Sequence, residues 1–295
     1  MLKRTLKPKR LISTFLLILS IIIIAVLLLP KLPVSQRKPA SMSLPGQVES
    51  TSSAATDEQN PPQKPLEVQA ASVSGYCLNV PVLLYHHIEP MAQAKQEGHG
   101  FLTVDNAVFD QQMGYLASKG YTTISAETLA QALINHQNLS KSVVLTFDDG
   151  YQDFYTYAYP VISKYNLTAN LAIPTGLMNN PGYLNWDQLK QMVASSKVFA
   201  YDHTWSHSSL PKDSQDKAQF EILTAKKQLE SNLGKPVNIF AYPYGSENGA
   251  VIDLLRSDGF IAAFSTASGF TQCNSFIMSL HRNRIGNSPL SSYGL

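Results

Sequence analysis

From residue 80 onward, short apolar segments alternate with amphipathic ones, and this alternation is the strongest constraint on the fold. The apolar segments are rich in β-branched and aromatic residues, as buried strands are, and lie at 80–85, 121–124, 143–147, 168–173, 197–201, 238–242 and 261–266. Helices are predicted between them, at 105–119, 125–133, 154–165, 185–195, 214–233 and 250–259. About seven strand–helix repeats predict an α/β fold with a parallel sheet, and they favour a distorted (β/α)7 barrel of the TIM type over an open sheet.

Polar side chains collect directly after four of the predicted strands. The C-terminal ends of barrel strands meet at one rim, where functional sites sit. Groups that are distant in the sequence are therefore expected to converge at that rim. The residues concerned are His86 and His87, then Asp148 and Asp149, then Asp202, His203 and His207, and finally Pro243, Tyr244 and Gly245.

The acid pair Asp148-Asp149 needs a positive partner, because neighbouring carboxylates repel each other and are costly to bury. His203 and His207 are four residues apart, the spacing of one helical turn, so both imidazoles can face one ion. Each motif alone has an ordinary reading, as a turn or as surface histidines. Together they predict a divalent metal site at the rim.

Three motifs resemble those of a known family: TFDDG (146–150), HTWSH (203–207) and AYPYG (241–245), in this order. They are similar to the motifs of the polysaccharide deacetylases, the family-four carbohydrate esterases with a NodB-homology domain. The segments VLLYHHI and FAYPYG resemble the branch that contains poly-N-acetylglucosamine deacetylases, in which a histidine motif stands at the start of the domain. The resemblance covers about residues 80–287.

The resemblance implies a role for each matching residue. The metal, commonly zinc in this family, would be bound by Asp149, His203 and His207. Asp148 would be the general base, and His86 the general acid with His87 as second choice. The backbone N–H of Tyr244 would help to hold the oxyanion, and Tyr244, Trp205 and His87 are candidate substrate contacts.

The sequence departs from the family pattern in two places. Many members carry an arginine that orients the base where this chain has Ala241. Arg282 or Arg284 is a candidate replacement, although both can be ordinary surface residues. The late tryptophan motif is not evident, and Trp186 and Trp205 are either aromatic walls for a sugar ring or core packing.

The N-terminal part predicts a membrane anchor. Residues 1–10 carry five basic residues and no acid, and 11–29 carry no charge. Nineteen helical residues span about 28 Å, close to the thickness of the bilayer's hydrocarbon core. We expect a cytoplasmic segment at 1–10, an uncleaved single-pass anchor at 11–30, a flexible Ser- and Pro-rich linker at 31–75 and an extracellular catalytic domain at 76–295.

Cys77 and Cys273 are the only cysteines and lie near the two ends of the predicted domain. They are either bridged, as an extracellular location allows, or two buried thiols. The net charge of +2 does not indicate a nucleic-acid partner.

We therefore expect a membrane-tethered, metal-dependent hydrolase. Its predicted reaction removes N-acetyl groups from the N-acetylglucosamine units of an extracellular or cell-wall polysaccharide. An O-acetyl carbohydrate esterase on the same scaffold and a non-catalytic glycan-binding protein are the alternatives.

Overall fold

The computed structural model describes residues 75–295. The predicted segments 1–10 and 11–30, and the 31–75 linker up to residue 74, lie outside the described residues. Within residues 75–295, no helix is both long enough and apolar enough to cross a bilayer.

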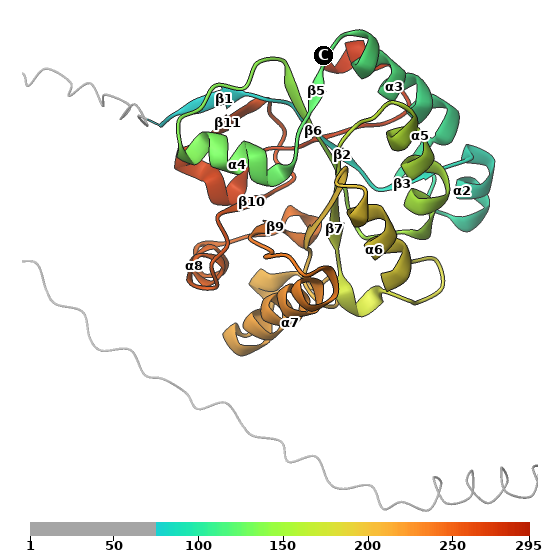
Figure 1. The fold of residues 1–295 in the computed structure, drawn as a ribbon. Helices are drawn as coiled ribbons and strands as arrows, with labels where there is room; N and C mark the ends of the chain where they lie inside the picture. Colours follow the sequence, from blue (N-terminus) through green and yellow to red (C-terminus); the bar gives the residue numbers. More distant parts are fainter. Residues whose placement is uncertain (1–74) are drawn as a thin grey trace, which may run out of the picture. The chain divides into compact units, whose positions relative to one another are not determined.

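The elements follow one another much as the alternation predicts (Figure 1). The strands are β1 (Cys77–Asn79), β2 (Val82–Tyr85), β3 (His87–Glu89), β4 (Thr103–Asp105), β5 (Thr122–Thr123), β6 (Ser142–Phe147), β7 (Ala169–Ile173), β8 (Val198–Asp202), β9 (Ile239–Ala241), β10 (Ala262–Phe264), β11 (Thr271–Cys273) and β12 (Asn283–Arg284). The α-helices are α2 (Met91–Glu97), α3 (Asn106–Ser118), α4 (Ala126–Ile134), α5 (Tyr159–Lys164), α6 (Trp186–Ala194), α7 (Gln215–Leu233) and α8 (Gly249–Ser257). A π-helical turn, η1 (Phe154–Ala158), leads into α5.

Capping residues set the starts of the helices. Side chains of Asp105, Ser125, Asn185, Ser214 and Asn248 each accept a hydrogen bond from a backbone N–H in the first turn of α3, α4, α6, α7 and α8. These contacts satisfy N–H groups that have no partner inside the helix. The predicted helix starts therefore agree with the structure to within a residue or two.

The central sheet is parallel and has the strand order β10-β9-β8-β7-β6-β2-β12, with β5 also paired to β6. Beyond β10, the chain returns and Leu280 forms a single parallel bridge with Phe264 before β12 pairs with β2. The predicted parallel α/β class is confirmed. The sheet is a curled half-barrel. Between its edges, β10 and β2, lies only the short 280–284 segment, which forms a single bridge to β10 and a two-residue ladder with β2.

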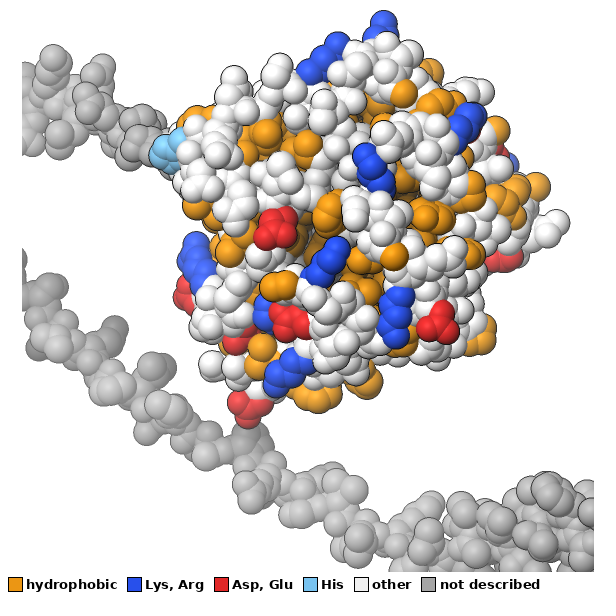
Figure 2. Space-filling view, in the orientation of Figure 1, with side chains coloured by type: hydrophobic (Ala, Val, Ile, Leu, Met, Phe, Trp, Pro, Cys, Tyr) orange, Lys and Arg blue, Asp and Glu red, His pale blue; other side chains and the backbone are white. Residues whose placement is uncertain are grey.

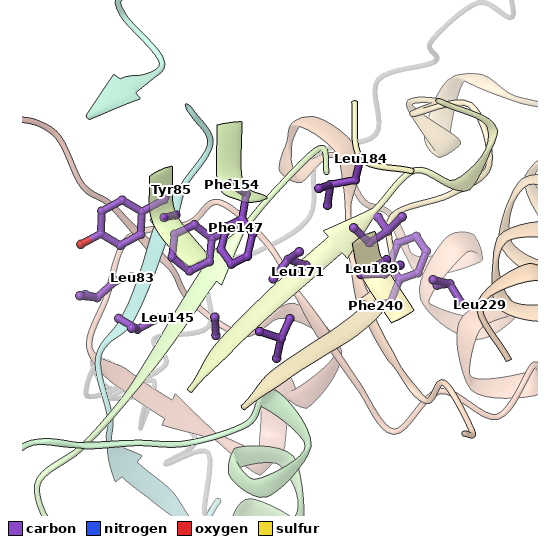
Figure 3. Close-up of a cluster of buried hydrophobic side chains, with 14 of the residues drawn as sticks. Leu83, Tyr85, Leu145, Phe147, Phe154, Leu171, Leu184, Leu189, Leu229 and Phe240 are labelled. Atoms are coloured by element: carbon purple, nitrogen blue, oxygen red, sulfur yellow. The ribbon is translucent and has the colours of Figure 1, made fainter. Parts of the chain in front are cut away.

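Alternate strand residues face two different layers. Leu83, Leu145, Leu171 and Phe240 belong to a core that packs against the covering helices, where Leu189 and Leu229 meet them (Figure 3). The intervening residues face the inside of the curled sheet, as the two-residue period of a strand requires. They form a second buried cluster, with Val82, Val144, Ala172, Ala241, Phe264 and Leu280 among its members.

Two peripheral sheets were not predicted. β1 pairs antiparallel with β11, opposite Cys77 and Cys273, and a disulfide joins these two cysteines. β3 pairs with β4 and encloses α2 in an excursion between β2 and α3. Strands of three residues have too short a period to be recognised in the sequence.

The surface carries charges of both signs. On the face in Figure 2, acidic and basic side chains are scattered among apolar ones and form no single-sign patch. This face offers no basic stripe of the kind that tracks a nucleic-acid backbone.

Candidate active site

Asp149, His203 and His207 form a compact cluster beyond the ends of β6 and β8. Oδ1 of Asp149 lies 3.4 Å from Nε2 of His203 and 3.1 Å from Nε2 of His207. Asp149 and His203 are buried, and the His207 side chain is 20% exposed. One potential ligand atom from each residue lies within 4.8 Å of the others. The predicted metal-ligating residues are therefore brought together.

The outer nitrogens of both imidazoles are already engaged. Nδ1 of His203 donates to the carbonyl oxygen of Ala241 at 2.8 Å, and Nδ1 of His207 lies 3.1 Å from the Tyr244 hydroxyl. A carbonyl only accepts, so Nδ1 of His203 carries a proton, and Nε2 is the nitrogen that faces Asp149. Such outer partners orient metal-binding histidines in proteins.

The segment that carries the two histidines is not helical, so the prediction of a helical turn is wrong. Thr204 and His207 have left-handed backbone angles, with φ of 66° and 62°. Oδ1 of the buried Asp202 accepts from Thr204 N at 2.7 Å, which holds the first bend. On α7, Glu221 accepts from both the backbone N and the Oγ of Ser206. These carboxylates stabilise a loop whose backbone strain brings both rings toward Asp149.

The cluster fits a divalent cation. Asp149 Oδ1 is buried and makes no hydrogen bond, although the two imidazole nitrogens lie close to it. Burial by itself would raise the pKa of the Asp149 carboxyl, but His203 and His207 outweigh it and hold that pKa well below its ordinary value. Two nitrogens and one carboxylate oxygen are a common donor set for catalytic zinc, which leaves a coordination position open.

Asp148 does not share this cluster and is held by Arg282 instead. Nη1 of Arg282 donates to Oδ1 of Asp148 at 2.7 Å, and its Nε donates to the Ser265 carbonyl at 2.8 Å. Burial would raise the pKa of Asp148, but Arg282 and His203 lower it below its ordinary value. Arg282 thus supplies a charge at Asp148 where the family arginine position is Ala241. Arg284 is exposed and binds the carbonyl of Phe101.

His86 and Tyr244 flank the two acids. His86 lies within electrostatic reach of both Asp148 and Asp149, and its Nδ1 is buried without a hydrogen-bond partner. Burial lowers the pKa of His86, and the two carboxylates oppose this effect. Tyr244 is 70% exposed, and its φ of 61° is left-handed. A strained, exposed residue beside His207 suits a substrate contact.

The other two predicted substrate contacts, Trp205 and His87, pack against further side chains. Trp205 packs edge-on against Phe220. His87 is buried and stacks on Tyr151 and His99, with Nδ1 2.5 Å from Asp153. The structure therefore places His87 in a different group of side chains from Asp148.

Comparison with known proteins identifies the family to which the chain belongs. A family profile described as polysaccharide deacetylase matches residues 135–263. A Streptococcus pyogenes deacetylase, PplD, solved in complex with acetate, is 30% identical with a TM-score of 0.67, over 72% of this chain and 96% of PplD. YxkH of Bacillus subtilis, provisionally named a polysaccharide deacetylase, is 28% identical over 70% of this chain and 71% of YxkH.

The poly-β-1,6-N-acetyl-D-glucosamine N-deacetylase of Escherichia coli is 25% identical, over 70% of this chain but only 36% of that longer protein. Together with the site geometry, these similarities define an enzyme of the carbohydrate deacetylase class. The chain belongs to the polysaccharide deacetylase family, carbohydrate esterase family 4, as its three motifs predict.

Proposed function

We propose that this protein removes N-acetyl groups by hydrolysis from the N-acetylglucosamine units of an extracellular or cell-wall polysaccharide. The reaction uses a bound divalent ion, and the proposed ligands favour zinc. The observation that carries the proposal is that two adjacent acids have different partners. Asp149 faces two imidazole nitrogens, whereas Asp148 is paired with Arg282. One acid is thus available to a metal and the other to a proton.

Amide hydrolysis requires an activated water and a protonated leaving nitrogen. An ion held by Asp149, His203 and His207 would supply Lewis acidity and lower the pKa of a water molecule. Asp148 accepts the proton from that water, since its lowered pKa keeps it ionised at neutral pH. Arg282 holds the Asp148 carboxylate in one orientation through a buried hydrogen bond.

The same site contains groups for the later half of the reaction. His86 donates a proton to the departing sugar nitrogen, so that acetate and a free amine result. The backbone N–H of Tyr244 stabilises the oxyanion, a contribution of about 3–4 kcal/mol for one such donor. The acetate in the PplD complex is the product that this reaction would release.

We also propose that the enzyme works outside the cell, tethered to its membrane. The support is the uncharged stretch at 11–29, which follows a basic segment and precedes a polar one. A tether favours a substrate of the cell surface over a soluble one. Protease accessibility of residues 76–295 in intact cells tests this placement, and protection of that region would contradict it.

The test of function is acetate release from poly-N-acetylglucosamine by the purified protein, before and after chelation. We expect activity that chelator removes and Zn²⁺ restores. Asp148→Asn should abolish activity while the zinc at Asp149, His203 and His207 stays bound, whereas His207→Gln should lose the zinc of that site. An Asp148→Asn variant with unchanged activity would refute the assigned base.

A matched substrate distinguishes the esterase alternative. O-acetylated xylan offers the same acetyl group on an oxygen leaving group. Release from xylan without release from the N-acetylated glycan would replace the proposed deacetylase with an O-acetyl esterase. Absence of release from both would favour a glycan-binding protein.

A further inference from the structure

A second group of metal-binding side chains lies in the β3–α2–β4 excursion, apart from the candidate active site. His87 and Glu89 come from β3, and His99 follows α2. One potential ligand atom from each residue lies within 4.8 Å of the others, a limit that the Asp149 cluster also meets. His87 and Glu89 are buried.

The two histidines are oriented from outside by other carboxylates. Nδ1 of His87 lies 2.5 Å from Oδ2 of Asp153, and Nε2 of His99 lies 3.1 Å from Oε2 of Glu97. Nε2 of His87 is left for an ion, whereas Nδ1 of His99 lies 3.1 Å from Oε1 of Glu89 and 3.4 Å from Oγ1 of Thr103. Carboxylate–histidine pairs of this kind orient and strengthen imidazole ligands at metal sites.

Glu89 supplies the observation that points to a ligand. The Glu89 side chain is 2% exposed, and its Oε1 makes no hydrogen bond. That oxygen lies 3.1 Å from Nδ1 of His99. An unpartnered buried carboxylate oxygen is costly unless a cation or a proton satisfies it.

The carboxylates around His87, Glu89 and His99 also favour the binding of a cation. Glu89, Glu97 and Asp153 contribute three carboxylates, and among the ion pairs of residues 75–295 none of them meets a lysine or arginine. The rings of His87 and His99 are stacked, with centroids 4.0 Å apart.

We propose that His87, Glu89 and His99 bind a second divalent ion of the late transition series, for which Zn²⁺ is the probe. Two imidazole nitrogens and one carboxylate oxygen suit such an ion better than Ca²⁺ or Mg²⁺, which prefer oxygen ligands. Zinc bonds of about 2.1 Å place ligands about 3.4 Å apart. The potential ligand atoms of the three residues already lie within 4.8 Å of one another.

The site is accessible and adjoins the active site. A cavity of about 630 Å³ is lined by His87, Glu89 and His99, and also by Tyr151 and Tyr183. Tyr151 stacks on His87 with centroids 3.7 Å apart, and it follows Asp149 by two residues in the chain. The second ion would therefore fasten the excursion to the residues that flank the proposed catalytic cluster.

The test is the zinc content of the full-length protein after loading and removal of free metal. We expect two equivalents per chain in the wild type and one in Glu89→Gln and in His99→Gln. His207→Gln should also hold one equivalent, which separates this site from the proposed catalytic one. His136→Gln, in a histidine that contacts Tyr76 and Asn274 instead, is the control and should hold two.

A second measurement covers the case in which Glu89→Gln does not fold. Co²⁺ loaded into His207→Gln should give visible absorption bands that disappear in the His207→Gln/His99→Gln double variant. His99 is a partly exposed loop residue, so its replacement should leave the circular dichroism unchanged. If His207→Gln holds no zinc, or if His99→Gln retains the wild-type zinc content and the double variant retains the cobalt bands, the proposal is wrong, whatever the state of the proposed catalytic site.

Discussion

Arg282 reaches across 134 residues of sequence to donate a buried hydrogen bond to Asp148 at 2.7 Å. Arg282 is 1% exposed and Asp148 is 4% exposed, so neither charge is screened by water. A buried charge that loses its partner is far costlier than an exposed one. The pair therefore links the segment directly before β12 to the proposed catalytic base.

Arg282→Met should destabilise the protein by about 3–5 kcal/mol, because the Asp148 carboxylate stays buried without its partner. Acetate release should also fall, since the base loses both its orientation and its charge partner. Urea unfolding and activity assays measure the two effects. Arg284→Met is the matched control, because Arg284 is exposed, and equal effects of the two substitutions would contradict the assignment.

Tyr244→Phe should weaken zinc binding by about tenfold. The hydroxyl contacts Nδ1 of His207 and so orients a metal ligand, and loss of such outer contacts costs about 10–100-fold in affinity. The proposed oxyanion contact uses the backbone N–H, which phenylalanine keeps. Zinc titration measures the affinity, with Tyr155→Phe as control because its hydroxyl contacts Gln191 instead. Unaltered zinc affinity in Tyr244→Phe would show that the hydroxyl does not orient His207.

Cys77→Ser/Cys273→Ser should lower the free energy of unfolding by about 5 kcal/mol. The disulfide closes a loop with a sequence separation of 196 residues, and the chain-entropy model assigns this order of effect to so long a loop. Equilibrium urea unfolding gives the value. Reducing agent should lower the free energy of unfolding of the wild type to that of the variant and leave the variant unaffected. An unchanged free energy of unfolding in the reduced wild type would contradict the estimate.

Glu247→Gln should stabilise the protein at neutral pH. Burial raises the pKa of Glu247, partly offset by the hydrogen bond from Ser279, and its Oε2 has no partner. The folded state thus holds this proton more tightly than the unfolded state. The contribution of Glu247 to the free energy of unfolding is therefore greatest at low pH. It falls as the pH rises from the ordinary carboxyl pKa of 4.5 through the raised pKa of the folded state, and it stays constant at higher pH.

Urea unfolding between pH 4.5 and 8 measures this slope. The Glu247→Gln variant should lack the part of the decline that Glu247 causes. Asp253→Asn is the control, since the Asp253 side chain is 77% exposed. Identical pH profiles for wild type and Glu247→Gln would show that this carboxyl is not perturbed by folding.

The alternation of strands and helices, the order of the rim motifs and the family resemblance all follow from the sequence alone. Local periodicity and capping residues carry that information, because each strand or helix is a property of neighbouring residues. The same reasoning predicts that Asp149, His203 and His207 meet, since parallel strands share an edge. It fails at the 203–207 loop, where Asp202 and Glu221 stabilise left-handed backbone angles that a helical spacing does not foresee.

Tertiary structure decided which arginine serves Asp148, where His87 belongs and how far the sheet closes. Arg282 and Arg284 are equivalent candidates in the sequence, yet they are two residues apart on a segment where one is buried and the other exposed. His86 and His87 are adjacent and face different groups, because successive strand residues point to opposite sides. Such outcomes depend on contacts between segments that are distant in the chain, and only the assembled fold sets those distances.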